Sequence, residues 1–334
     1  METEQHIRLT SAEISSLWGT YISNSMSICV LRYLIEKAED AEIKKVLELA
    51  LEIANKSLED AGYIFNKENY PLPIGFTDED VNIKAKRLWS DEFSLQYLNQ
   101  MAKSGFTAYG MSVGMSSRKD IREYFNKNLH LNTELNSKIK DTLLSKGLYI
   151  RPPYISPPDK ADYVKKQSFL TGWFGDRKPL LGIEIAHLFH NIETNAVGKM
   201  LIMGFSQVAE QQDSRDFFTR GKKISSKHIE VFGSILKEED IPVPMSWSMD
   251  VTDSQEAPFS DKLMMFHITM LNGTGIGNYG LAMAGSTRRD LITHFVRLAA
   301  EIGQYAEDGA NLMIKHGWLE EPPQTVDREK LNKQ

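Results

Sequence analysis

The stretch EISSLWGTYISN at residues 13–24 returns 171 positions later as EIAHLFHNIETN at residues 184–195. The two segments share Glu, Ile, Leu and Asn at corresponding positions, and no gap is needed to align them. At about 100° per residue, the Glu, Leu and Asn of each segment lie within about 40° of one another on a helix. The pair therefore predicts a helical protein in which one unit occurs twice.

The repeat extends along almost the whole chain from this segment. The offset of 171 also places Pro71-Leu72-Pro73 on Pro242-Val243-Pro244, and beyond these prolines the offset becomes 170. There Arg118-Lys119-Asp120 falls on Arg288-Arg289-Asp290. A period of this length is too long for a solenoid and suits two complete domains.

Each copy is predicted to contain four helices. In the first copy, apolar residues recur every three or four positions over 11–38 and 41–67. A third helix is expected to begin at Ser90-Asp91 and to end near residues 114–117, and a fourth is expected at about 118–146. Prolines interrupt the pattern and make residues 66–89 a long connector. We therefore predict an all-α fold of two tandem ferritin-like four-helix bundles, up-down-down-up with a long crossover between the second and third helices. A plain up-down-up-down bundle is the alternative.

The predicted domains are a first bundle at residues 1–153, a bridge at 154–178, a second bundle at 179–325 and a tail at 326–334. The bridge begins Pro-rich and includes the aromatic segment FLTGWFG at residues 169–175. So apolar a segment is expected to pack against one or both bundles and to fix their relation.

Composition and charge exclude several classes of function. The 334 residues are 41% hydrophobic and 25% charged, with a formal net charge of −6, which argues against a nucleic-acid partner or a polybasic membrane-surface protein. Cys29 is the single cysteine, so no intramolecular disulfide or thiolate metal cage can form, and we expect it to be buried and inert. The N-terminus has no secretory signal and no apolar run reaches the length of a membrane span, so a cytoplasmic location is expected.

Several strings in the second copy carry a family resemblance. FLTGWFGDRKPL, EIAHLFHNIETN, PFSDKLMMFH and GWLEEPP resemble those of a family from Bacillus-type, spore-forming bacteria. That family is described as two tandem ferritin-like bundles distantly similar to spore coat proteins. The resemblance implies the fold and a spore-associated lineage, and it brings no catalytic residues.

A di-iron site can be tested directly against the sequence. Such bundles need one Glu from each of two helices and a Glu-x-x-His pair from each of the other two. Glu184-Ile185-Ala186-His187 is the one such pair at a plausible helical site, and its counterpart is Glu13-Ile14-Ser15-Ser16. The sequence therefore predicts no standard di-iron site and no cofactor.

A weaker alternative is a single Fe, Mn or Zn in the second bundle. Its candidate ligands are Glu184, His187, His190, His228 and His294. Against this, residues three apart drift by about 60° around a helix, so Glu184, His187 and His190 cannot all face one point. We favour structural histidines, with a metal site and acid–base use as the alternatives.

The repeated polar residues Glu13, Asn24, Glu184 and Asn195 share the Leu-bearing side of their helices and are predicted to be buried. Buried polar groups need partners, for which Lys56 and Lys227 or Arg118 and Arg288 are candidates. We favour a structural network or a helix-end contact over a ligand site. The repeated Arg-x-Asp is expected to cap the fourth helix and to form an ion pair between helices.

No complete catalytic constellation emerges from the sequence. The glycines of residues 273–280 continue a helical stretch and are not a dinucleotide fingerprint, which needs a preceding strand. The leading hypothesis is a non-enzymatic structural or interaction protein, with a protein partner or self-association. The alternatives are a metal-binding or oxidoreductase bundle in the second copy only, and a carrier of a small apolar ligand.

Overall fold

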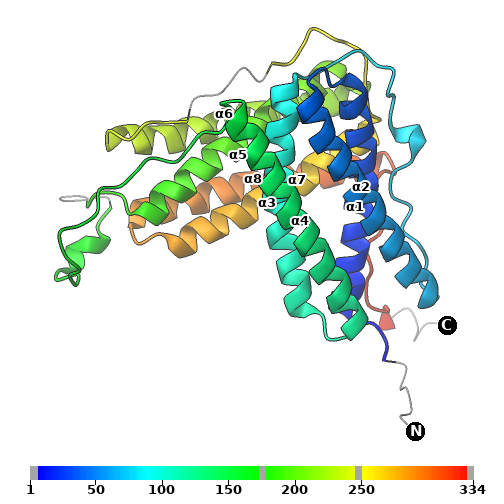
Figure 1. Ribbon diagram of the computed structural model, residues 1–334, viewed down its shortest axis with the longest axis horizontal. Coiled ribbons are helices and arrows are strands. Elements are labelled where there is room, and N and C mark those ends of the chain that lie inside the picture. Colours follow the sequence, from blue (N-terminus) through cyan, green and yellow to red (C-terminus); the bar gives the residue numbers. More distant parts are fainter. Residues whose placement is uncertain (1–6, 173–177, 245–249, 329–334) are drawn as a thin grey trace.

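The computed structural model describes residues 7–172, 178–244 and 250–328, and this part of the chain is built from helices without a β-sheet (Figure 1). The first copy contains α1 (Ser11–Lys37), α2 (Ala41–Lys67), α3 (Asp91–Met115) and α4 (Lys119–Ser145). The second contains α5 (Gly182–Val208), α6 (Gln212–Glu238), α7 (Asp261–Gly285) and α8 (Arg289–Lys315). Two short 3₁₀ helices, Asp78–Asp80 and Gln167–Leu170, lie in the connections. The all-α prediction is confirmed.

The helix ends follow the capping signals in the sequence. Thr10 and Glu13 form a capping box at the start of α1, and the Ser90 hydroxyl accepts from the backbone N–H of Phe93 at the start of α3. Gly147 follows the end of α4 with a φ of 68°, the left-handed conformation that glycine adopts at no steric cost. The same conformation recurs at Gly317 after α8, with a φ of 69°.

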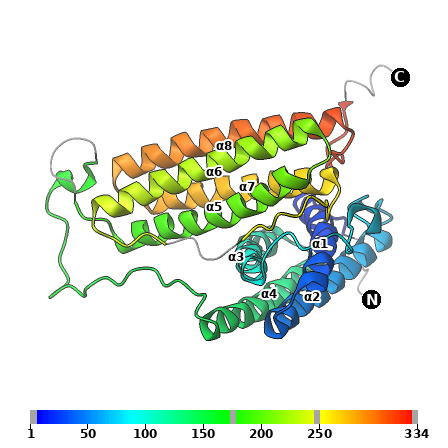
Figure 2. The same cartoon turned by 90° about the horizontal axis from the view of Figure 1, so that it is seen from above.

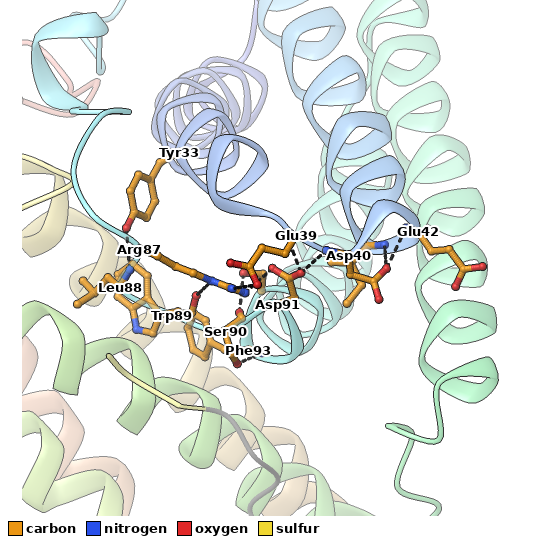
Figure 3. Close-up of polar contacts among 12 residues, drawn as sticks. Tyr33, Glu39, Asp40, Glu42, Arg87, Leu88, Trp89, Ser90, Asp91 and Phe93 are labelled. Atoms are coloured by element: carbon orange, nitrogen blue, oxygen red, sulfur yellow. Dashed lines mark hydrogen bonds and ion pairs between the residues drawn. The ribbon is translucent and has the colours of Figure 1, made fainter. Parts of the chain in front are cut away.

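The turn between α1 and α2 lies at the start of α3 (Figure 3). The Asp91 carboxylate accepts from the backbone N–H groups of Glu39 and Asp40, at 3.0 and 2.6 Å, and from the Arg87 guanidinium at 2.7 Å. In the second copy Asp261 accepts in the same way from Glu210 and Gln211. Since α3 begins where α2 begins, the two helices run parallel, and the connector between them spans the bundle. The predicted up-down-down-up topology is confirmed over the plain alternative.

The two connectors pair with each other in antiparallel register. Val81 bridges to Phe259 and Trp89 bridges to Val251. With the repeat offset of 170, Val251 is the counterpart of Val81 and Phe259 is the counterpart of Trp89. Exchanging the two copies therefore turns one bridge into the other. The two bundles are related by a pseudo-two-fold axis, like the subunits of a two-fold symmetric dimer.

Two pairs of counterparts meet each other near this pseudo-two-fold axis. The Tyr97 hydroxyl lies 3.0 Å from Nε2 of His267, and both side chains are buried. Lys86 Nζ lies 3.0 Å from a carboxylate oxygen of Glu256 on the surface. The two bundles cross one another along this junction (Figures 1 and 2).

An aromatic cluster forms the core of the junction. The Trp89 indole stacks on Phe93 and Phe259, meets Phe205 edge-on, and donates from Nε1 to the carbonyl of Met200 at 3.2 Å. Gly204 on α5 permits this approach, because a Cβ there would lie 2.6 Å from the indole ring. The main hydrophobic core is consequently continuous across both bundles, and each bundle has a smaller core of its own toward its far end.

The Pro-rich start of the bridge between the copies lies outside both bundles. Tyr154 and Tyr163 are 89% and 92% exposed, and residues 154–168 are exposed throughout. The segment lies outside the bundles as an extended trace (Figure 2). Phe169 is half-buried beneath the Lys178 ammonium, whereas residues 173–177, which include Trp173 and Phe174 of the aromatic segment, lie outside the described residues. The paired connectors, where Leu88, Trp89 and Phe259 are buried, join the bundles.

Acid is expected to destabilise the junction through His267. Burial lowers the pKa of His267 from 6.5 to about 3. The unfolded chain regains the ordinary pKa, so below pH 6.5 the unfolded state binds a proton that the folded state does not. The free energy of unfolding should therefore fall by about 1.4 kcal/mol per pH unit from this group as the pH drops from 6.5 toward 3.

Urea unfolding at a series of pH values would measure this slope. His267→Gln should reduce the dependence of the unfolding free energy on pH by the contribution of about one proton. His130→Gln, at a side chain that is 74% exposed, is the control and should leave it unchanged. Equal slopes in the wild-type protein and His267→Gln would refute the assignment.

Candidate functional site: a polar network and a cavity in the second bundle

The repeated glutamates join the starts of the first and fourth helices of each bundle. Glu184 accepts from the backbone N–H groups of Leu181 on its own side and of Thr287 and Arg288 across the bundle, at 2.8, 2.9 and 3.2 Å. Glu13 accepts in the same way from Thr10, Ser117 and Arg118, each at 2.8 Å. Burial raises the pKa of Glu13, but these hydrogen bonds outweigh it and lower the pKa to about 2. Both carboxylates are helix-end contacts.

The repeated arginines form the predicted ion pairs between helices. Arg118 pairs with Glu68 and Asp120 at 2.8 and 2.7 Å, and Arg288 pairs with Glu239 and Asp290 at 2.6 and 2.7 Å. Of these arginines, only the backbone N–H groups, and not the guanidinium groups, donate to Glu13 and Glu184. The suggested lysine partners are wrong, because Lys56 pairs with Asp60 and Lys227 with Glu301, whereas Lys178 lies 3.6 Å from Glu184.

The five candidate metal ligands are dispersed. Glu184 is engaged by backbone donors, and His187 and His190 line a pocket of about 150 Å³ beside Lys103. His228 is fully buried in the bundle core, and His294 lies beside Arg297 on α8. Across the described ranges, no group of three or more His, Cys, Asp or Glu side chains could hold a metal ion.

A buried chain of hydrogen bonds runs through the second bundle. The Tyr279 hydroxyl lies 2.8 Å from Nδ1 of His228, and Nε2 of His228 lies 3.0 Å from a carboxylate oxygen of Glu301. Asn195, which is half-buried rather than buried as predicted, donates to the same hydroxyl at 2.9 Å. With the proton on Nε2 facing Glu301, Nδ1 accepts from Tyr279 and every bond has one donor.

The first copy lacks this chain. Its counterparts of His228 and Glu301 are Ser57 and Leu131, and Asn24 donates to the Ser57 hydroxyl at 3.2 Å. Tyr124 then completes the cluster, with its hydroxyl 2.9 Å from that of Ser57. His228 and Glu301 are both replaced in the first copy. This paired difference could have indicated their contact from the sequence, but the sequence comparison considered the positions at which the two copies agree.

Tyr279, His228 and Glu301 are linked in the order in which a nucleophile, a base and an orienting carboxylate are linked in some enzymes. Burial raises the pKa of the Tyr279 phenol, and burial lowers the pKa of His228 against the opposing effect of Glu301. Both groups are therefore neutral near pH 7. The neutral phenol donates to His228 and accepts from Asn195.

Tyr279 also lines a cavity of about 80 Å³ between the bundles. Its walls come from α5, α6, α7 and α8 and from α3 of the first bundle, which contributes Tyr97, Gln100, Met101 and Ser104. None of the described residues that line it carries a charged side chain. The first bundle has a more open groove of about 450 Å³ between α1 and α3, at the corresponding place.

The fold and the duplicated helix-end contacts define a protein of two fused four-helix bundles. The chain belongs to the family described as "Protein of unknown function (DUF3231)", which matches residues 1–161 and 168–331, one match for each copy. It is also similar to a crystal structure from Bacillus halodurans of a proposed spore coat protein, at 19% identity and a TM-score of 0.42, over 46% of this chain and 99% of that one. No curated protein gives a significant match.

Among the described helices, none combines the length and the apolar character that crossing a membrane requires.

Proposed function

We propose that this protein is a non-enzymatic structural or interaction protein of the spore-forming cell, built from a duplicated bundle of the ferritin-like class. The observation that supports the proposal most strongly is the hydrogen bonding of Glu13 and Glu184, the two carboxylates that occur in both copies. Each is buried and accepts backbone N–H groups from two helices. A carboxylate committed in this way stabilises the bundle and is a poor candidate for a metal ligand.

The continuous core supports the same proposal. An aromatic cluster buried across both bundles makes the two halves one body, and interfaces of this apolar kind favour fixed over mobile arrangements. A partner protein or a second copy of the chain would meet this body at its surface. Spore association rests on the resemblance of the second-copy strings, and fractionation of sporulating cells tests it: the protein should co-purify with spores.

Metal content tests the non-enzymatic role. Protein purified without chelator should carry far less than one iron, manganese or zinc per chain after gel filtration, measured by elemental analysis. Stoichiometric metal would instead support the metal-binding or oxidoreductase alternative in the second copy. In that case His187→Ala and His228→Ala should abolish uptake, while His130→Ala, in the first copy and exposed, should not.

A further inference from the structure

We propose that the pocket lined by His187 and His190 binds a small carboxylate anion of about the size of butyrate. This site goes beyond a structural role for the protein and does not depend on it. The pocket has a volume of about 150 Å³ and lies where α3 of the first bundle meets α5 and α7 of the second. An engineered cavity of about 150 Å³ takes up benzene, so a ligand of about six non-hydrogen atoms fits here.

The ionisable residues that line the pocket are all bases. They are Lys103 on α3 and His187 and His190 on α5, and none of the described lining residues is acidic. The other polar lining residues carry hydroxyl or amide groups that can donate hydrogen bonds, namely Gln100, Ser104, Thr107, Thr194 and Asn278. A pocket that offers a cation and several donors, and no carboxylate, favours an anion.

The two imidazole rings are available to a ligand. Both histidines are half-buried, neither ring makes a hydrogen bond within the described part of the chain, and the ring nitrogens are not fully buried. Burial lowers the pKa of His187. Burial also lowers the pKa of His190 to about 4, with a further contribution from the positive charge of Lys103. Both rings are therefore neutral near pH 7, and each carries one N–H that can donate to an anion.

Lys103 supplies the positive charge. Its Nζ donates to a carboxylate oxygen of Glu193 at 3.2 Å, and the side chain is 27% exposed. An ammonium group has three N–H donors, so this bond leaves two for a ligand. Glu193 does not line the pocket, and burial raises its pKa against the effect of Lys103. With one lysine and two neutral imidazoles, the pocket matches a monoanion such as a carboxylate better than a dianion, which would lose more hydration for the same counter-charge.

The first copy shows that these residues are particular to the second. The groove at the corresponding place has Ser16 and Gly19 at the positions of the two histidines, and its described lining residues include no charged side chain. By the offset of 170, the counterpart of Lys103 is Gly273. The fold therefore needs neither the imidazoles nor the ammonium at these positions, and their presence together in one pocket is explained by a ligand.

The test titrates the intact protein with butyrate and with butyramide, which has a similar shape and no charge. Binding is followed by the NMR signals of the His187 and His190 rings, assigned from variants at each position. Butyrate should shift both signals and bind about tenfold more tightly than butyramide, the effect of a charge-assisted hydrogen bond. Equal binding of the two probes, or ring signals that butyrate leaves unchanged, would overturn the proposal.

Matched variants locate the site. Lys103→Met should weaken butyrate binding about tenfold and leave butyramide binding unchanged. Lys127→Met is the control, because Lys127 also pairs with a carboxylate, that of Asp60 at 2.6 Å, but does not line the pocket. Equal losses in these two variants would refute the assignment.

His187→Ser covers the case in which Lys103→Met does not fold, since serine is the residue that the first copy has at this position of the helix. Loss of one neutral donor should weaken butyrate binding about fivefold. A folded His187→Ser protein that bound butyrate as tightly as the wild type would contradict a site at this pocket.

Discussion

Replacing Trp89 with alanine is expected to lower the free energy of unfolding by about 4 kcal/mol, the cost of emptying a large buried aromatic site. The indole is 3% exposed and lies where the paired connectors meet, in contact with Phe93, Phe205 and Phe259. Its loss would also leave the Met200 carbonyl without its donor. Denaturation by urea, followed by circular dichroism, measures the change.

Phe259 gives an internal comparison, because the repeat makes it the counterpart of Trp89. Phe259→Ala should cost about as much, 3 to 5 kcal/mol. Since the two rings stack on each other, the double variant should lose less than the sum of the single losses. Tyr63→Ala, at a side chain that is 70% exposed, should change stability by less than about 0.5 kcal/mol. A loss of under about 1 kcal/mol in Trp89→Ala would contradict the central role of the junction.

Removing either repeated carboxylate is expected to be nearly as costly. Glu13→Ala and Glu184→Ala should each lower the free energy of unfolding by about 3 kcal/mol, because each leaves backbone N–H groups at two helix starts without their charged acceptor. Glu123→Ala is the control, since Glu123 is 67% exposed and pairs with Lys119 on the surface. Its effect should stay within about 0.5 kcal/mol.

The effect of Glu13 should also depend on pH. Its folded pKa of about 2 lies below the ordinary value of 4.5, so its stabilising contribution is fully present above pH 4.5 and is lost as the pH falls toward 2. The difference in unfolding free energy between wild type and Glu13→Ala should therefore shrink over that range. A difference that stayed constant from pH 5 to about 2 would show that charge is not the cause.

The helices and their topology could be predicted because their signals are local or repeated. Ser90 as a cap, Gly147 as a stop and the length of the connector can each be recognised within a few residues of sequence. The burial of Glu13 followed from its position on the same side of the helix as Leu17. Its partners did not follow, because the backbone N–H groups of Ser117 and Arg118 carry no residue-specific signal.

The candidate site depends on contacts that no single segment contains. His228 and Glu301 are 73 residues apart, and their pairing depends on how α6 and α8 pack. The cavity in the second bundle is lined in part by α3 of the first bundle, and the paired connectors hold the two bundles together. In the bridge, Tyr154 and Tyr163 are exposed because the Pro-rich chain around them lies outside the bundles, whereas the aromatic segment that follows begins with the half-buried Phe169.

The pairs near the pseudo-two-fold axis show what covalent fusion permits. In a dimer of identical chains, a residue on the axis faces its own copy, so Lys would face Lys and repel it. Here Lys86 faces Glu256, and Tyr97 faces His267, because counterparts in a single chain can differ. The joining of the two halves is also intramolecular, so it does not weaken on dilution as a dimer would. One chain thus combines the geometry of a symmetric dimer with opposite charges and different side chains at positions where symmetry would demand the same residue.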